Sequence, residues 1–150
     1  MRLRRPASLL GIAVLLLLTA TCTRTDLDIE SPTGPSTQSL TFTLEAHPNV
    51  LLATSEQPAS VIKGIVRRNG DPVANLPVYF TVLSGPGEFD DYTTRIMAMT
   101  DTTGTARVTY LGPSEDEMSG DKTAIIKGQP ETSSPDYLYK TIEVRILKGN

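Results

Sequence analysis

The stretch GDPVANLPVYFTVLSGPGEF, residues 70–89, decides what kind of fold this chain can form. Its centre, VYFTVL, sets Val78, Phe80 and Val82 on one face of an extended strand and the intervening side chains on the other. Gly, Pro and Asn flank this centre, and Pro77 stands at the first strand position, where a missing N–H does no harm. The stretch therefore predicts a core strand between two tight connections, with Phe80 serving the stability of the domain.

The same two-residue alternation recurs along the chain, and no helical stretch interrupts it. Seven short strands with turn residues between them predict an all-β fold, namely a single antiparallel β-sandwich of about seven strands. The strand-like segments are LTFTL (40–44), VIKGIVRR (61–68), VYFTVL (78–83), RIMAMT (95–100), ARVTYL (106–111), TAIIKG (123–128) and KTIEVRIL (140–147).

One connection carries a specific turn signal. DTTG places Asp101 at the first position of a type I turn and Gly104 at the fourth. The Asp101 carboxylate can accept backbone N–H groups inside the turn, and Gly104 can take a positive φ. We therefore expect residues 95–111 to form a tight hairpin.

These two motifs together resemble the bacterial immunoglobulin-like group 1 domain, the repeat of invasin and intimin. That family typically reads N-G-x-P-V-x-G-x-x-V-x-F-x-V, then T-D-x-x-G-x-A-x-V-x-L. Asn75 stands near a usual Gly, and Tyr110 replaces a usual aliphatic residue. The resemblance covers roughly residues 40–147 and implies an Ig-like sandwich that acts in adhesion, in protein–protein contact or as a structural spacer. The matching positions are Asn69, Gly70, Pro72, Val73, Val78, Phe80, Val82, Thr100, Asp101, Gly104, Ala106 and Val108.

A second resemblance leaves an alternative function open. The G-x-P-V element also occurs in carboxypeptidase-regulatory-like and transthyretin-like sandwiches, which are β-sandwiches as well. This resemblance implies a module that binds a small ligand or a carbohydrate. Tyr137 and Tyr139 in PDYLYK are the candidates for stacking on a sugar, and the alternative is that they are ordinary edge-strand residues.

The N-terminus carries an export signal. Three arginines in MRLRRP precede the apolar run ASLLGIAVLLLLTA at 7–20, which predicts a signal peptide over residues 1–21. The run is shorter than the about 20 residues that a transmembrane helix needs, so a retained membrane anchor is the less favoured alternative.

The only cysteine, Cys22, follows this signal directly. Its placement resembles the lipobox of bacterial lipoproteins, which implies an acylated Cys22 and attachment to a membrane. Thr23, in place of Asp, resembles an outer-membrane address. Cleavage after Ala20 is the alternative, and it would give a secreted or periplasmic protein.

Residues 22–39 form a predicted flexible tether, and residues 40–150 the sandwich domain. The tether is rich in Ser, Thr, Pro and Gly, buries too little apolar surface to fold, and would span about 20–25 Å as a coil. Residues 1–21 hold three Arg and no acid, so the net charge of −3 becomes −6 without them. This charge argues against nucleic acid as a partner. We expect the partner to be an envelope or surface protein instead.

The sequence shows no combination of residues that predicts catalysis. His47 is the only histidine, and it lies in a predicted loop before a proline. Acyl transfer would need a nucleophile with a base, and zinc would need three or four convergent ligands. We therefore expect no enzyme activity, no metal site of the zinc type and no cofactor.

The acidic loops form the last candidate site. Successive connections of a sandwich alternate between its ends, so those at 47–59, 84–94 and 112–122 should share one end. We expect a solvated acidic rim there, and the alternative is that the crowded carboxylates hold Ca²⁺. The predicted acidic end contains Glu88, Asp90, Asp91, Glu115, Asp116 and Glu117, with Glu56 and Asp121 nearby.

Overall fold

The computed structural model describes residues 40–132 and 138–149 of the 150-residue chain. These residues all belong to one unit of the chain, Thr37–Asn150. The predicted signal peptide (1–21) and the predicted tether with Cys22 (22–39) lie outside the described residues, and so does Tyr137.

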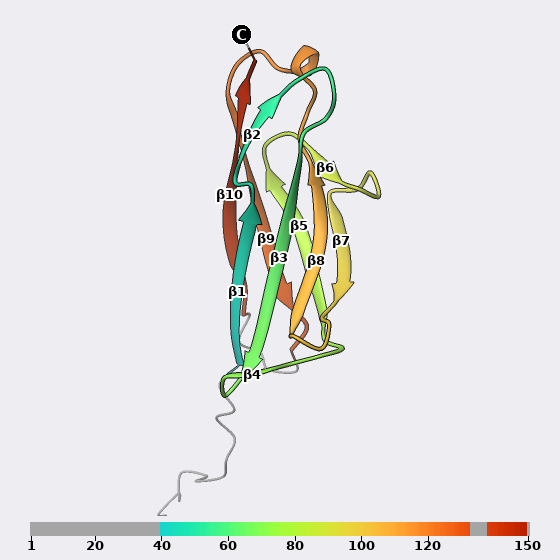
Figure 1. Cartoon of the computed structure of the whole chain (residues 1–150), viewed down its shortest axis with the longest axis vertical. Helices are drawn as coiled ribbons and strands as arrows, with labels where there is room; N and C mark the ends of the chain where they lie inside the picture. The colour runs from blue at the N-terminus through green and yellow to red at the C-terminus, as the bar shows by residue number, and fades with distance from the viewer. Residues whose placement is uncertain (1–39, 133–137, 150) are drawn as a thin grey trace, which may run out of the picture. The chain divides into compact units, whose positions relative to one another are not determined.

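Ten strand segments and one short 3₁₀ helix make up the ordered elements of these residues (Figure 1). The longer strands coincide with the segments that alternate in sequence. In chain order, the elements are β1 (Leu40–His47), β2 (Val50–Ala53), β3 (Ala59–Arg68), β4 (Asp71–Pro72), β5 (Pro77–Ser84), β6 (Glu88–Phe89), β7 (Arg95–Met99), β8 (Thr105–Leu111), η1 (Glu115–Glu117), β9 (Lys122–Pro130) and β10 (Lys140–Lys148).

The strands form two five-stranded sheets. One has the order β1-β3-β8-β6, with β4 also paired to β3, and the other has the order β2-β10-β9-β5-β7. The first order matches the A-B-E-D sheet of an immunoglobulin fold, and β5-β9-β10 matches its C-F-G sheet. The predicted fold class, an all-β Ig-like β-sandwich, is therefore confirmed.

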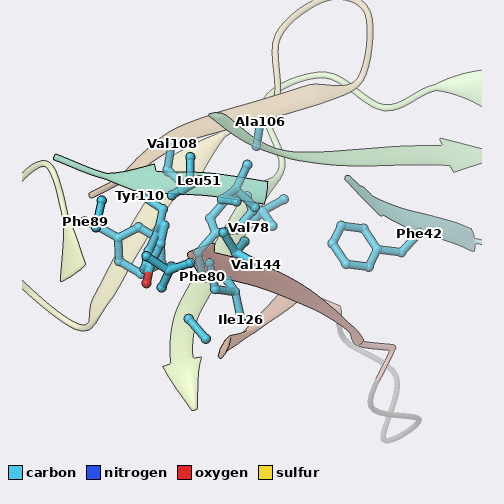
Figure 2. Packing of buried hydrophobic residues seen from close by; sticks show 14 of the residues in the cluster. Phe42, Leu51, Val78, Phe80, Phe89, Ala106, Val108, Tyr110, Ile126 and Val144 are labelled. Atoms are coloured by element: carbon cyan, nitrogen blue, oxygen red, sulfur yellow. The ribbon is translucent and has the colours of Figure 1, made fainter. Parts of the chain in front are cut away.

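Alternating side chains build the core between the sheets (Figure 2). Ile62 and Val66 of β3 are fully buried, and so are Val78 and Phe80 of β5, as the alternation predicts. Each buried side chain of this size contributes about 1.5–3 kcal/mol, so this face stabilises the sandwich. The apolar core consists of Phe42, Leu51, Ala53, Ile62, Val66, Val78, Phe80, Phe89, Ala106, Val108, Tyr110, Met118, Ala124, Ile126, Val144 and Ile146.

Two glycines make room for the ring of Phe42. A Cβ placed on Gly64 of β3 would lie 3.0 Å from Phe42 Cε2, and a Cβ on Gly128 of β9 would lie 2.9 Å from Phe42 Cζ. Gly64 belongs to the same sheet as Phe42, whereas Gly128 belongs to the facing sheet. The ring therefore fills the space that the two missing side chains leave.

The core also holds one buried hydroxyl. The Tyr110 hydroxyl donates a hydrogen bond to the carbonyl oxygen of Pro86, and the residue is fully buried. Burial raises the pKa of Tyr110 to about 12. The hydroxyl is thus satisfied inside the core and ties the connection after β5 to β8.

The turn at Asp101 has the predicted chemistry. Gly104 N donates to Asp101 O at 2.9 Å, and Gly104 has a φ of 76°. The Asp101 carboxylate accepts from Thr103 N (2.8 Å) and Thr105 N (3.1 Å), and it pairs with Arg107 Nη1 at 2.6 Å. The Thr103 hydroxyl, then Arg107 and the Thr105 amide hold the pKa of Asp101 well below its usual range.

The prediction of a hairpin over 95–111 is wrong. β7 pairs with β5, whereas β8 pairs with β3 and β6 in the other sheet. The turn reverses the chain but carries it from one sheet to the other. Turn chemistry acts over a few residues and does not select the strand that each arm pairs with.

Three short strands, β2, β4 and β6, were not predicted, and one of them breaks the antiparallel pattern. The expected connection at 47–59 contains β2, because Val50–Ala53 pairs in parallel with Arg145–Lys148 of β10. The chain crosses to the second sheet after the cis His47–Pro48 peptide bond. Leu51 and Ala53 are then buried in the core. A segment of four residues is too short for its alternation to stand out in the sequence.

Candidate functional site

Three regions of the surface bear on function: the acidic end, the outer face of the second sheet, and the edge strand β7. The single histidine, His47, is exposed at the end of β1. Over residues 40–132 and 138–149, no three His, Cys, Asp or Glu side chains come together in a way that could hold a metal ion. No helix within those ranges has the length and hydropathy needed to span a membrane.

The three acidic connections lie at one end of the sandwich. Gly112 N donates to Pro58 O at 2.8 Å, and Glu115 N donates to Thr54 O at 2.9 Å, which ties the connection after β8 to the connection after β2. Glu88 of β6 pairs with Leu111 at the end of β8, so the connection after β5 reaches the same end.

Two carboxylates at this acidic end accept hydrogen bonds from their own loops. Asp91 accepts from Thr93 N (3.1 Å) and Thr93 Oγ1 (2.7 Å). Glu117 accepts from Ser114 N and Ser114 Oγ, both at 2.9 Å. These bonds hold each carboxylate to its own loop.

Two further acids of the acidic end have polar partners. The Ser114 hydroxyl lowers the pKa of Asp116, and Asp121 accepts from the backbone N–H of Lys148 at 3.0 Å. A shallow hollow of about 430 Å³ is lined by Ser55, Glu115, Asp116 and Lys148, so a cation already lies beside two of the acids. The geometry fits the expected solvated rim, a polar cap that fixes the loops, and Ca²⁺ binding there stays the alternative to be tested.

A basic hollow lies on the outer face of β9, β5 and β7. The register of these strands places Thr81 opposite Lys127 on one side and opposite Arg95 on the other. Two residues along β5 on the same face, Tyr79 stands opposite Gln129 on one side and Met97 on the other. The hollow has a volume of about 380 Å³ and is lined by Tyr79, Thr81, Arg95, Lys127, Gln129, Pro130, Glu131 and Thr132.

Both cations of the basic hollow lie over tyrosine rings. The Arg95 guanidinium carbon is 5.3 Å from the centre of the Tyr79 ring, and Lys127 Nζ is 5.8 Å from the centre of the Tyr139 ring. Lys127 Nζ also donates to Gln129 Oε1 at 3.1 Å. Cation–π contacts of this kind contribute about 0.5–1 kcal/mol at exposed sites, so they favour one position of each cation.

The sequence predicts only part of this site. Tyr139 was a candidate, and it lies 53% exposed directly before β10. Tyr79, Arg95 and Lys127 were missed because they are far apart in sequence and meet only through the pairing of three strands. The sequence does show that each of the three stands at an outward-facing position of an alternating strand. It does not show which residues of other strands lie beside them in the sheet.

The free edge of β7 is the third region. Met97 and Met99 point outward and are 50% and 48% exposed. Thr100 N donates to Leu76 O, and Val82 N donates to Thr94 O, which sets the phase of the antiparallel ladder between β5 and β7. Hydrogen-bonded and non-hydrogen-bonded residue pairs alternate along such a ladder. Met97 and Met99 stand in non-hydrogen-bonded pairs, so their N–H and C=O groups face away from β5. Among the described strands, β7 pairs with β5 alone.

Comparison with known proteins identifies the fold and leaves the function open. No model of a known protein family matches the sequence. No curated protein matches it either. The structure is similar to the D00-D0 domain of intimin, with a TM-score of 0.53 and 20% sequence identity over 71% of this chain and 46% of that chain. The described domain thus has an Ig-like fold similar to that of the intimin structure, and the chain spans less than half of that structure.

Two further structures share a weaker similarity. One is WR4, an MSP family member from C. elegans, with a TM-score of 0.44 and 8% identity over 71% of this chain and 97% of that chain. The other is a lipoprotein from Bacteroides thetaiotaomicron, with a TM-score of 0.42 and 11% identity over 73% of this chain and 81% of that chain.

Proposed function

We propose that this protein is a non-catalytic module of the cell envelope, attached to a membrane through a lipid on Cys22. Its Ig-like sandwich acts by protein–protein contact, in adhesion or as part of a surface assembly. The observation that carries this proposal is the free edge of β7, where the backbone groups of the half-exposed Met97 and Met99 face away from β5. Methionine is enriched at protein interfaces, and an unpaired sheet edge can accept a further strand.

The edge suggests how the contact is made. An extended segment of a partner can add to a sheet edge, with backbone hydrogen bonds for affinity and alternate side chains for specificity. Met97 and Met99 lie on one face, two residues apart, so they would contact alternate apolar side chains of such a segment. The partner we expect is therefore an envelope or surface protein that offers an extended apolar strand.

The attachment rests on the order of elements at the N-terminus. A basic segment, an apolar run of about the length of a signal and then the single cysteine are arranged as in a lipoprotein precursor. The outer membrane is the favoured location, and a secreted or periplasmic protein is the alternative. Cys22→Ser should release the protein from the membrane fraction or stall its processing. Unchanged membrane recovery of this variant would exclude a lipid on Cys22.

The contact is tested by capture from an envelope extract with paired variants. Met97→Lys with Met99→Lys places charges on the edge of β7, which disfavours strand addition. Val50→Lys with Leu52→Lys is the matched control, because these are exposed apolar residues of β2 at the opposite edge of the same sheet. We expect the first pair to lose the captured protein and the second pair to keep it. Equal capture by both pairs would refute the β7 contact.

The basic hollow favours a second candidate function, the binding of a small ligand or a carbohydrate. Its volume of about 380 Å³ falls within the range of about 300–1,000 Å³ that is usual for ligand sites. It also combines hydrogen-bonding side chains with a tyrosine ring. A glycan array run with the full chain tests this function separately from the capture experiment.

A further inference from the structure

The basic hollow has two chemically different ends. The row of Lys127, Thr81 and Arg95 lies at one end, and Glu131, whose N–H donates to Pro77 O at 2.8 Å, lies four residues along the strand at the other. At about 3.3 Å per residue, the two ends are about 13 Å apart. One end therefore favours negative charge, whereas the other accepts hydrogen bonds and disfavours negative charge.

The charge of the cationic end is available to a ligand. In the part of the chain that the structure describes, the only ion pair joins Arg107 and Asp101, so neither Arg95 nor Lys127 has a carboxylate partner there. The two strands that carry them flank β5, which sets their Cα atoms about 9–10 Å apart. Arg95 offers a planar fork that matches a carboxylate or a sulfate, and Lys127 offers a point charge.

The floor between the two ends is polar. Thr81 contributes a hydroxyl and Gln129 an amide, both half-buried, and Tyr79 stands beside Gln129 in the same row of the sheet. Hydroxyl and amide groups of this kind hydrogen-bond the hydroxyls of a sugar. The tyrosine rings hold Arg95 and Lys127 in place before a ligand binds, so these side chains lose less conformational entropy on binding.

We propose that the basic hollow binds an anionic saccharide, whose carboxylate or sulfate groups meet Arg95 and Lys127 while its hydroxyls meet Gln129 and Glu131. This proposal rests on the second candidate function and is independent of the β7 contact. Charge complementarity at one end and an acceptor at the other favour an acidic sugar over an acidic peptide. A peptide rich in Asp or Glu would place a carboxylate against Glu131.

Calorimetric titration of the full chain tests the proposal with four probes: a galacturonic acid tetramer, a sulfated galactose tetramer, a neutral galactose tetramer and a tetraglutamate peptide. We expect binding of the uronate or the sulfated probe, and the difference between them identifies the acidic group. Arg95→Gln and Lys127→Gln should each weaken that binding about tenfold, as the loss of a charged hydrogen bond does. The matched control, Lys63→Gln with Arg145→Gln, removes two charges elsewhere and should leave it unchanged.

The possible results separate this proposal from the function on which it rests. Neutral and acidic saccharides binding equally well would overturn the anionic ligand but keep the carbohydrate module. Tetraglutamate binding more tightly than every saccharide would overturn the sugar and indicate an acidic peptide. No heat with any saccharide would overturn both. Thermal melting of each variant verifies the fold, and because only an exposed cation–π contact is lost in each, we expect Tm to fall by no more than about 4 °C.

Discussion

Replacing Gly128 with alanine should destabilise the domain, mainly because the added Cβ disturbs the packing of Phe42. Gly128 lies in the interior of β9 and faces the ring of Phe42 from the opposite sheet. A Cβ there would come 2.8 Å from Leu44 Cδ1 and 2.9 Å from Phe42 Cζ. Ordinary carbon contacts are about 3.5–4.0 Å, so both side chains would have to move by several tenths of an ångström.

The size of the effect follows from two opposing terms. An added methyl group in a packed core costs about 1–3 kcal/mol. The alanine also restricts the unfolded chain, which offsets about 0.4–1 kcal/mol of that cost. We therefore expect Gly128→Ala to lower the free energy of unfolding by about 1–2 kcal/mol. For a domain of this size, that corresponds to a fall in Tm of about 4–8 °C.

A double-mutant cycle in urea unfolding links the loss to the ring. Phe42→Leu alone should cost about 1–2 kcal/mol because the smaller side chain leaves space. Combined with Gly128→Ala, it should cost less than the two single losses together, by at least about 0.5 kcal/mol. Gly112→Ala is the control, since its Cβ would meet Pro58 and Leu51 and not Phe42, so its loss should add to that of Phe42→Leu. Additive losses in the cycle would refute the packing of Phe42 against Gly128.

Three further predictions follow from the same structure. Phe80→Ala should lower the free energy of unfolding by about 3–5 kcal/mol, because the ring is fully buried, and a Tm within two degrees of the parent in calorimetry would contradict this. Since the pKa of Asp101 is lowered in the fold, its stabilisation is present above its usual pKa near 3.8 and is lost as the pH falls below that value. Asp101→Asn should therefore flatten the acid side of the stability profile measured by urea unfolding, and an unchanged profile would count against it. Titration with Ca²⁺ at low millimolar concentration should leave Tm unchanged, because no three acids among the described residues come together as metal ligands, and a rise that disappears in Asp90→Asn with Asp116→Asn would establish a site.

The longer strands could be predicted because their signal is local. Phe80, Ile62 and Val144 stand in segments where every second residue is apolar, and the structure buries all three. The Asp101 turn could be predicted for the same reason, since Asp101 and Gly104 form their bonds within a few residues. In both cases, the information is contained within one segment.

The candidate sites could be predicted only in fragments. Tyr139 was singled out as an aromatic residue, and the acidic loops as charged connections. The basic hollow was not predicted, because Tyr79, Arg95 and Lys127 come from three strands separated by other strands along the chain. Their meeting depends on β5 lying between β7 and β9.

The sequence by itself determined which segments are strands, which faces are buried and where the chain turns, because alternation and turn chemistry act over a few residues. Only the tertiary structure decided which strands are neighbours. It placed β7 beside β5 instead of β8, and it paired β2 in parallel with β10. Strand pairing is decided by the burial of both sheet faces at once, a property of the whole domain that no single segment carries.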